Sequence, residues 1–319
     1  RQRTWLVGPK ALTARLHKGL LTRTPPASGW PGIACRPRHE RRPRRRASRR
    51  PPRRRTLLAR ALACDRVSLY TRFDEVVNGP ALDAFRALVQ RRAAGEPVAY
   101  LLGQREFWSL PLAVTPATLI PRPETETLVA LALARIPADA DAWIADLGTG
   151  SGAIALAIAR ERPRSRVIAT DISQDALAVA AANAKGLGLT NVQCLAGDWC
   201  AALPDQPFDL IVSNPPYIPE DDIHLTRGDV RFEPRHALAA GPQGMDALQV
   251  IARCAGTRLR PQGWLMLEHG YDQAQAVTRL LHTCGYEAVH DYPDDAGLGR
   301  VIAGRRPATP GQFCSETTD

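Results

Sequence analysis

The four residues Asn214-Pro215-Pro216-Tyr217 are the part of the chain best suited to chemistry. They follow the apolar run DLIVS, and the two prolines make the turn rigid. Such a turn can aim the Asn214 side-chain oxygen and the Pro215 carbonyl at one point, with the ring of Tyr217 beside it. Two acceptors and a ring suit a planar –NH2 group whose nitrogen attacks an electrophile and gains positive charge. The alternative is a plain turn, because Asn-Pro is a common loop dipeptide.

A glycine-rich turn lies upstream, within the stretch 143–159, WIADLGTGSGAIALAIA. The turn consists of Gly148, Thr149, Gly150, Ser151 and Gly152. Glycine permits a tight bend between a strand and a helix, and it lets a ligand lie on the backbone beside the N–H groups of the helix. The spacing is not the G-x-G-x-x-G of nicotinamide enzymes, and the Lys-Ser or Lys-Thr pair of a P-loop is missing. A cofactor cradle is therefore predicted, with a purely structural turn as the alternative.

Acidic residues end the next two predicted strands. Asp171 lies 21 residues after Gly150, where a doubly wound sheet places an acid against the ribose hydroxyls of an adenosine cofactor. A carboxylate suits paired hydroxyl donors because it only accepts hydrogen bonds. Asp198-Trp199 follows the third strand, where Trp199 can stack on adenine and Asp198 can accept from its amino group. A helix-capping acid and a rim aromatic are the structural alternatives.

Strands and helices alternate from residue 125 onward, as in an open, mostly parallel α/β sheet. The predicted strands are 143–147, 166–173, 191–200, 208–217 and 263–270, and the predicted helices are 125–135, 153–159, 174–185, 245–259 and 273–284. Two more extended segments lie near 288–292 and 299–303. Residues 218–244 show neither the hydrophobic period of a strand nor that of a helix. An irregular run of this length favours a lid or binding loop over the site.

The residues before this region predict helices and a hairpin. Amphipathic patterns predict helices over 56–77 and 80–95, interrupted at Gly79-Pro80. Residues 100–102 and 107–114 alternate like a hairpin around Gly103-Gln104, and Ile120–Pro123 form a stiff connector because each proline fixes φ.

The net charge of +10 over 319 residues belongs to one segment. Residues 1–55 carry 18 Lys and Arg against one acid, which leaves the remaining 264 residues with a net charge of −7. The globular part is therefore mildly acidic, which argues against a nucleic-acid-binding surface. We expect the Arg/Pro-rich segment 1–55 to be disordered or not authentic coding sequence, with an RNA-binding tail as the alternative.

The seven cysteines are scattered and include no C-x-x-C pair, which does not suggest a disulfide framework and favours a reducing, cytoplasmic setting. Cys194 and Cys200 could be metal ligands, but they have no nearby partner in sequence, so no metal is expected. Apolar runs are also shorter than the roughly 18 residues of a membrane helix.

Taken together, the motifs resemble one enzyme family. EPVAYLLGQREFW, LIPRPETE, DLGTGSG, NPPYIP, RFEP and LEHG, spread from Thr56 to Arg305, are similar to the release factor glutamine methyltransferases, the PrmC/HemK family. The resemblance implies an α/β class I methyltransferase with a Rossmann-like, seven-stranded, mostly parallel sheet and an antiparallel last strand. It also implies a small N-terminal helical domain and a hairpin linker. The implied parts are a helical substrate-binding domain 56–97, a hairpin and linker 98–124 and a methyltransferase domain 125–306. The basic segment 1–55 resembles nothing in the family, and residues 307–319 are expected to form a loose tail.

The resemblance also implies roles for the residues singled out above. S-adenosyl-L-methionine would be bound by the glycine turn 148–152, Asp171, Trp199 and Asn214. The substrate would be the glutamine of the Gly-Gly-Gln motif of peptide chain release factors, held by residues 214–217, with Asn214, Pro215 and Tyr217 as the catalytic residues. Three alternatives stay open: methylation of an amino group of adenine or another base in DNA or RNA, methylation of a ribosomal-protein glutamine, and a non-catalytic cofactor-binding protein.

Overall fold

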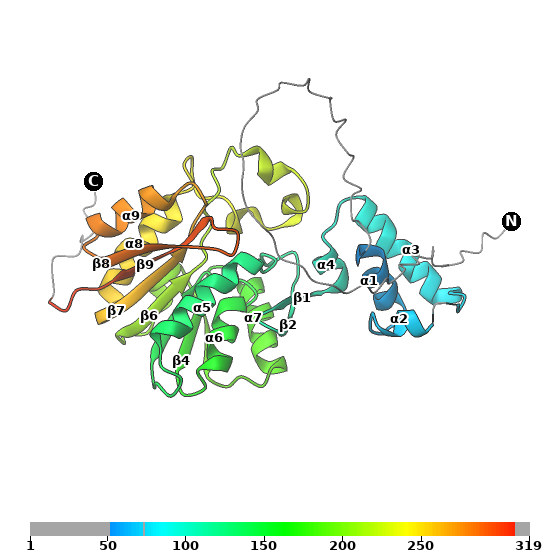
Figure 1. The fold of residues 1–319 in the computed structure, drawn as a ribbon, viewed down its shortest axis with the longest axis horizontal. Coiled ribbons are helices and arrows are strands. Elements are labelled where there is room, and N and C mark those ends of the chain that lie inside the picture. The colour runs from blue at the N-terminus through cyan, green and yellow to red at the C-terminus, as the bar shows by residue number, and fades with distance from the viewer. Residues whose placement is uncertain (1–51, 73, 310–319) are drawn as a thin grey trace, which may run out of the picture. The chain divides into compact units, whose positions relative to one another are not determined.

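The computed structural model describes residues 52–72 and 74–309 (Figure 1). The chain divides into two compact units, residues 1–89 and residues 90–319. Most of the predicted basic segment 1–55 therefore lies outside the described residues, as does the tail from residue 310. Across the described ranges, none of the helices has the length and apolar character needed to span a bilayer.

The first unit is helical, with α1 at Pro52–Ala61, α2 at Ser68–Thr71 and most of α3 at Gly79–Ala93. The prediction of one helix over 56–77 is wrong, because the chain leaves the helix after α1. Ala63 takes a left-handed φ of +49°. The carboxylate of Asp65 then accepts a hydrogen bond from the Ser68 N–H at 2.7 Å. This side-chain turn competes with helix continuation and starts α2 instead.

The hairpin follows a short helix, α4 at Val98–Leu102, which the sequence did not predict. Gly103, with φ of +72°, ends α4, so it is a helix cap and not the hairpin turn. The strands are β1, Gln104–Phe107, and β2, Leu110–Ala113. Trp108 and Ser109 form the turn with φ of +50° and +57°, the pair of positive angles that matches the twist of a two-residue hairpin.

A seven-stranded sheet forms the centre of the second unit, in the order β5-β4-β3-β6-β7-β9-β8. The strands are β3 Trp143–Leu147, β4 Arg166–Asp171, β5 Val192–Ala196, β6 Phe208–Ser213, β7 Leu259–Glu268, β8 Glu287–Pro293 and β9 Gly299–Arg305. Strands β3 to β7 pair in parallel, and β9 is antiparallel to both of its neighbours. The chain builds the sheet first on one side of β3 and then on the other, so β3 and β6 flank the switch point where such sheets bind ligands.

Helices cover both faces of this sheet (Figure 1). One core packs α5, α6 and α7 against one face, and a second core packs α8 and α9 against the other. Their bounds are α5 Glu126–Arg135, α6 Ala153–Glu161, α7 Gln174–Gly186, α8 Asp246–Arg258 and α9 Ala274–Thr283. Neighbouring strand residues contribute to opposite cores, as Ile144 and Ala145 do on β3. The class I methyltransferase fold predicted above is confirmed.

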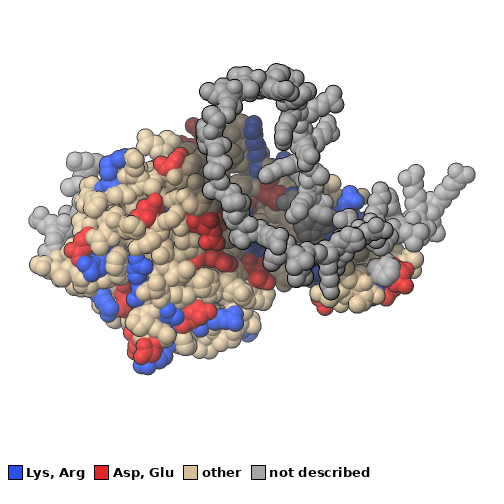
Figure 2. All heavy atoms as spheres, viewed as in Figure 1, with Lys and Arg blue, Asp and Glu red and all other residues tan. Residues whose placement is uncertain are grey.

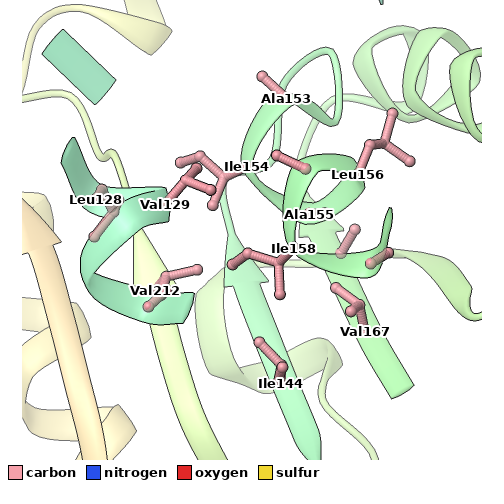
Figure 3. Packing of buried hydrophobic residues seen from close by; sticks show 14 of the residues in the cluster. Leu128, Val129, Ile144, Ala153, Ile154, Ala155, Leu156, Ile158, Val167 and Val212 are labelled. Atoms are coloured by element: carbon pink, nitrogen blue, oxygen red, sulfur yellow. The ribbon is translucent and has the colours of Figure 1, made fainter. Parts of the chain in front are cut away.

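Helix α6, which follows the glycine turn, is deeply buried. Ile154 and Ile158 of α6 lie with Val129 of α5 and Ile144 of β3 in one apolar cluster (Figure 3). All seven residues from Ala153 to Ala159 are buried, so the small side chains bring α6 close to the sheet. This packing fixes the position of the helix N-terminus at the edge of the cavity described below.

Residues 218–244 contain no α-helix or sheet strand, in agreement with their lack of sequence period. They form three short 3-10 turns, η3 Ile223–Thr226, η4 Val230–Phe232 and η5 Arg235–Ala237. One isolated bridge, Ile218 to Ala239, closes the segment.

The surface of the sheet domain mixes charges of both signs. On the face drawn in Figure 2, Lys and Arg side chains of this domain alternate with Asp and Glu. The described residues visible on this face therefore do not form an extended basic surface of the kind that tracks a phosphate backbone.

The packing of α6 makes a stability prediction. Ile158→Ala should lower the free energy of unfolding by about 2–5 kcal/mol, because it removes fully buried methyl groups and leaves a cavity. Val250 on α8 is 48% exposed, so Val250→Ala should change the same quantity by less than about 0.5 kcal/mol. Urea titration of both variants measures the difference. Equal stabilities would contradict the described packing.

Candidate active site

The glycine turn joins β3 to α6 with three left-handed residues. Gly148, Gly150 and Gly152 have φ of +70°, +57° and +85°, which side-chain-bearing residues rarely adopt. A Cβ on Gly148 would lie 3.1 Å from the ring of Trp199, so a side chain there would also push against that ring. A Cβ on Gly150 would meet nothing within 4 Å, because this glycine faces open space. The backbone at Gly150 is thus available to a ligand.

Asp146, at the end of β3, holds the turn from beneath. One carboxylate oxygen accepts from the Thr149 hydroxyl at 2.7 Å and from the Ala155 N–H, in the first turn of α6, at 3.0 Å. The second bond satisfies one of the free N–H groups at the start of α6, where the capping residue Gly152 has no side chain. Burial raises the pKa of Asp146 to about 7, against the opposing effect of these hydrogen bonds.

Asp171 links the end of β4 to the glycine turn. One of its oxygens accepts from the Gly150 N–H at 2.9 Å, and the other accepts from the Ser173 N–H at 2.9 Å. A carboxylate has about four acceptor positions, so two remain for hydroxyl donors from a ligand. The predicted ribose-binding acid therefore also fixes the backbone of Gly150.

Trp199 begins η2, Trp199–Ala202, directly after β5. It has a left-handed φ of +39°, and its ring covers the first glycine of the turn. Ile172, which sequence reasoning did not single out, lines the same cavity, is 69% exposed and offers an apolar surface to a flat ring. Trp199 packs on the sheet and also lines the cavity. A structural role as a rim aromatic is therefore compatible with the predicted stacking on adenine.

Residues 214–217 follow β6 and reach the same edge of the sheet. The Asn214 side-chain N–H2 donates to the Thr125 hydroxyl at 3.1 Å. This bond leaves the Asn214 oxygen as the free acceptor of the amide group. At the other end of the turn, the Gln273 amide donates to the Tyr217 carbonyl at 3.0 Å, and the Tyr217 hydroxyl donates to Glu268 at 3.1 Å.

These elements surround a cavity with an empty volume of about 970 Å³, its open mouth included. The lining includes most of the predicted site residues, namely Gly148, Thr149, Gly150, Ser151, Asp171, Asp198, Trp199, Asn214, Pro215 and Pro216. Gly152 and Tyr217, which were also predicted, do not line it. Gly152 packs against Leu156 and Ala180, and Tyr217 turns its hydroxyl toward Glu268.

The cavity has a second side. Its linker residues Ala117, Thr118, Leu119, Pro121 and Arg122, and Thr125, were not predicted as part of the site, whereas His236 and Ala237 come from the segment 218–244 that was predicted to lie over it. The LIPRPETE and RFEP motifs contain Arg122 and Glu233, but nothing in their spacing assigned them a role. The buried Glu233 carboxylate accepts from the Ile120 N–H at 3.0 Å and from the Arg122 guanidinium at 2.5 Å. Glu233 thus ties the irregular segment 218–244 to the linker.

One cysteine prediction needs correction. Cys200 of η2 and Cys254 of α8 form a disulfide, with 6.0 Å between their Cα atoms. The two residues are 54 positions apart, and only the packing of η2 against α8 brings them together. Cys194, which could have shared a metal with Cys200, is a thiol. Within residues 52–72 and 74–309, no group of three or more His, Cys, Asp or Glu residues is arranged to hold a metal ion.

The sheet order, the glycine turn after β3 and the Asn-Pro-Pro-Tyr turn after β6 define a class I methyltransferase. Family models agree: the methyltransferase small domain matches residues 126–229, and the PrmC N-terminal domain matches residues 44–103. The release factor glutamine methyltransferase of Xylella fastidiosa (strain Temecula1) is 55% identical over 251 residues, 79% of this chain and 91% of that protein. The protein of the same name from Coxiella burnetii is 49% identical over 250 residues, 78% of this chain and 90% of that protein.

The chain therefore belongs to the release factor glutamine methyltransferase family. Among solved structures, the hMettl16 catalytic domain in complex with a MAT2A 3′UTR hairpin superimposes with a TM-score of 0.52 at 14% identity. The match covers 67% of this chain and 84% of that one, and at this identity it shows the fold alone.

The position of Asp171 leads to a binding prediction. Asp171→Ala should weaken S-adenosylmethionine binding by about 1.5–3 kcal/mol, roughly 10- to 150-fold, because hydrogen bonds to a charged acceptor are lost. Asp175, an exposed acid in the first turn of α7, does not line the cavity, so Asp175→Ala is the matched control. Titration calorimetry measures both affinities. If Asp171→Ala bound S-adenosylmethionine with unchanged affinity, the prediction that Asp171 binds the ribose would be wrong.

Proposed function

We propose that this enzyme transfers a methyl group from S-adenosyl-L-methionine to the side-chain nitrogen N5 of a glutamine in peptide chain release factors. The acceptor is the glutamine of the Gly-Gly-Gln motif. Family membership supports the reaction class, and the orientation of Asn214 supports the chemistry at this site. We further propose a cytoplasmic location, because release factors act there in translation.

The residues around the cavity fit the proposed cofactor. Gly150 leaves its backbone face open, Asp171 keeps two acceptor positions, and Trp199 with Ile172 provides apolar surface. When bound, S-adenosylmethionine supplies a methyl group attached to a positively charged sulfur. The turn 148–152 would hold its methionine part, as the family resemblance implies.

Asn214 is the observation that carries the proposal. Its N–H2 is occupied by Thr125, so its oxygen is left to accept one hydrogen of a substrate amide. The Pro215 carbonyl would accept the other hydrogen. With both hydrogens held, the plane of the amide group is fixed, and the nitrogen lone pair, which is perpendicular to that plane, can be turned toward the methyl group of the cofactor. Ordering of reacting groups of this kind can supply on the order of 7–11 kcal/mol of the barrier.

A general base is not needed before the attack. An amide nitrogen becomes strongly acidic once it forms a fourth bond, so its extra proton leaves to water after methyl transfer. The protein's contribution is to orient the amide and to stabilise the charge that develops on nitrogen. Tyr217 contributes by anchoring the end of the turn through its hydroxyl and carbonyl.

Mass spectrometry of a release factor after incubation with the enzyme and S-adenosylmethionine tests the proposal. A mass increase of about 14 Da, located on the Gly-Gly-Gln glutamine, is the expected result. Parallel reactions offer double-stranded DNA, RNA and a ribosomal-protein fraction as acceptors. Methylation of one of these, with an unmodified release factor, would contradict the proposed substrate.

The role of Asn214 makes a kinetic prediction. Asn214→Ala should reduce methyl transfer by about 10²–10³-fold, or roughly 2.7–4 kcal/mol, because one preorganised electrostatic partner is lost. The loss should fall on kcat more than on KM, since the contact strengthens as charge develops. Cofactor affinity, measured by calorimetry, should change little and controls for folding. Tyr217→Phe should be milder, because only the hydroxyl is removed. Full activity of Asn214→Ala would contradict the proposed orientation of the amide.

The segment 218–244 makes a prediction about dynamics. It contributes His236 and Ala237 to the cavity and is tied to the linker by Glu233, so a protein substrate that enters the cavity should contact it. Hydrogen exchange in this segment should slow when a release factor binds, whereas β3 should exchange equally slowly in both states. Exchange in 218–244 that does not respond to the release factor would argue against a lid.

A further inference from the structure

Gln273 is a buried amide side chain that joins three stretches of the chain beside the site. It directly precedes α9 and is 8% exposed. It does not line the cavity, yet its side chain takes part in four hydrogen bonds, all with backbone groups. A buried amide group is normally satisfied by hydrogen bonds, but these partners are far apart in sequence, so the side chain holds separate segments together.

The nitrogen of this side chain donates to both ends of the segment 218–244. Its partners are the carbonyls of Tyr217 at 3.0 Å, Gly244 at 3.2 Å and Gln243 at 3.3 Å, so two hydrogens are shared among three acceptors. Tyr217 is the last residue before the segment, and Gln243 and Gly244 are its last two residues. One amide group therefore closes the base of the segment.

The oxygen of the same side chain fixes its direction. It accepts from the Gly270 N–H at 2.8 Å, and the Gln273 N–H donates to the Gly270 carbonyl at 2.9 Å. Gly270 follows the end of β7, so the side chain is anchored to the central sheet. Carbonyls only accept and N–H groups only donate, so a single orientation of the amide satisfies all four bonds.

The two ends of the segment also meet backbone to backbone at Gly244. This residue has a left-handed φ of +68°, and a Cβ on it would lie 2.2 Å from the Tyr217 carbonyl oxygen. Glycine is thus required for the close approach. Bringing the ends of a long irregular segment together costs chain entropy, which the bonds to Gln273 help to offset.

The closed base leads directly to the cavity. The Ile218 N–H donates to the Leu238 carbonyl at 2.9 Å, and the Ala240 N–H donates to the Ile218 carbonyl at 3.0 Å. Leu238 follows His236 and Ala237, which line the cavity. The pairing that starts at Gln273 therefore continues to the part of the segment that faces the site.

We propose that Gln273 is a positioning residue for the protein substrate: by closing the base of the segment 218–244, it holds His236 and Ala237 in the arrangement that a release factor binds. The inference rests on the proposed function, because it assigns a role in binding the same substrate. Asn214 is held by Thr125, and the cofactor side of the cavity rests on β3 to β5, so neither depends on Gln273.

The first test is Gln273→Glu, which keeps the shape of the side chain but places an oxygen against three carbonyls. KM for the release factor should rise about 5- to 50-fold, because only a fraction of the enzyme then holds the segment in its binding arrangement. Both kcat and the affinity for S-adenosylmethionine should change less than about threefold. Partial unfolding would lower kcat and leave KM unchanged, so this division separates positioning from a loss of folded enzyme.

A matched control and a second variant complete the test. Gln275 is exposed on α9, so Gln275→Glu makes the same chemical change and should leave KM unaltered. Gln273→Met removes the donors without burying a charge, covers the case in which Gln273→Glu does not fold, and should raise KM in the same way. In the free enzyme, the Ile218 and Ala240 N–H groups should exchange hydrogen faster in either Gln273 variant, while β3 should not change.

The outcomes are distinct. A raised KM together with faster exchange at the base of the segment would support the inference. An unchanged KM, a loss confined to kcat, or unchanged exchange at Ile218 and Ala240 would overturn it while the unmodified enzyme still methylates release factors. An unmodified enzyme that methylates no release factor would instead overturn the proposed function, and the substrate-binding role of Gln273 with it.

Discussion

A buried hydrogen bond between the ends of two strands joins the two halves of the site. The Ser213 hydroxyl, at the end of β6, donates to the Leu147 carbonyl, at the end of β3, at 2.6 Å. Leu147 is the last residue before the glycine turn, and Ser213 is the last before Asn214. The two strands also pair in parallel register at this point, so both turns begin at the same level of the sheet. The distance between the proposed cofactor cradle and the proposed amide acceptor is therefore set by the sheet itself and not by loops.

The same edge of the sheet holds two buried acids whose protonation is poised near neutrality. Asp146 is the last but one residue of β3 and supports the glycine turn, and Glu268 ends β7 and bonds to Tyr217 of the Asn-Pro-Pro-Tyr turn. Burial raises the pKa of each to about 7. Such groups work against stability as the pH rises: a carboxyl with a raised folded pKa favours folding most below its unfolded pKa of about 4, and this contribution declines up to the folded pKa. Both acids orient backbone or side-chain groups at the site, which accounts for their presence in a sheet whose buried residues are mostly apolar.

Local patterns predicted the parts of the fold that depend on local chemistry. The strand, glycine turn and helix from Trp143 to Ala159 need only an apolar run, residues tolerant of positive φ and a helical period, and all of these are visible in sequence. The hairpin was misplaced because its turn residues, Trp108 and Ser109, adopt positive φ without the glycine or asparagine that normally marks such a turn. Thr125, Glu233 and Glu268 gained their roles only through tertiary contacts, over separations of 51 to 113 residues in the bonds they make. The disulfide between Cys200 and Cys254 was missed for the same reason.

The two sides of the cavity differ in how they are built, and this difference bears on what each can recognise. The side formed by the glycine turn, Asp171 and Trp199 rests on strands β3 to β5, where sheet hydrogen bonds fix the backbone. The side formed by the linker and by residues 236–237 comes from irregular segments, held together by Glu233 through the Ile120 N–H and Arg122. A rigid side suits a small molecule of constant shape, whereas an irregular side with a few anchored contacts can adapt to a segment of another protein. Proline-rich linker residues and the ion pair between Arg122 and the buried Glu233 limit that adaptation, so the proposed peptide substrate would meet a surface that is already largely formed.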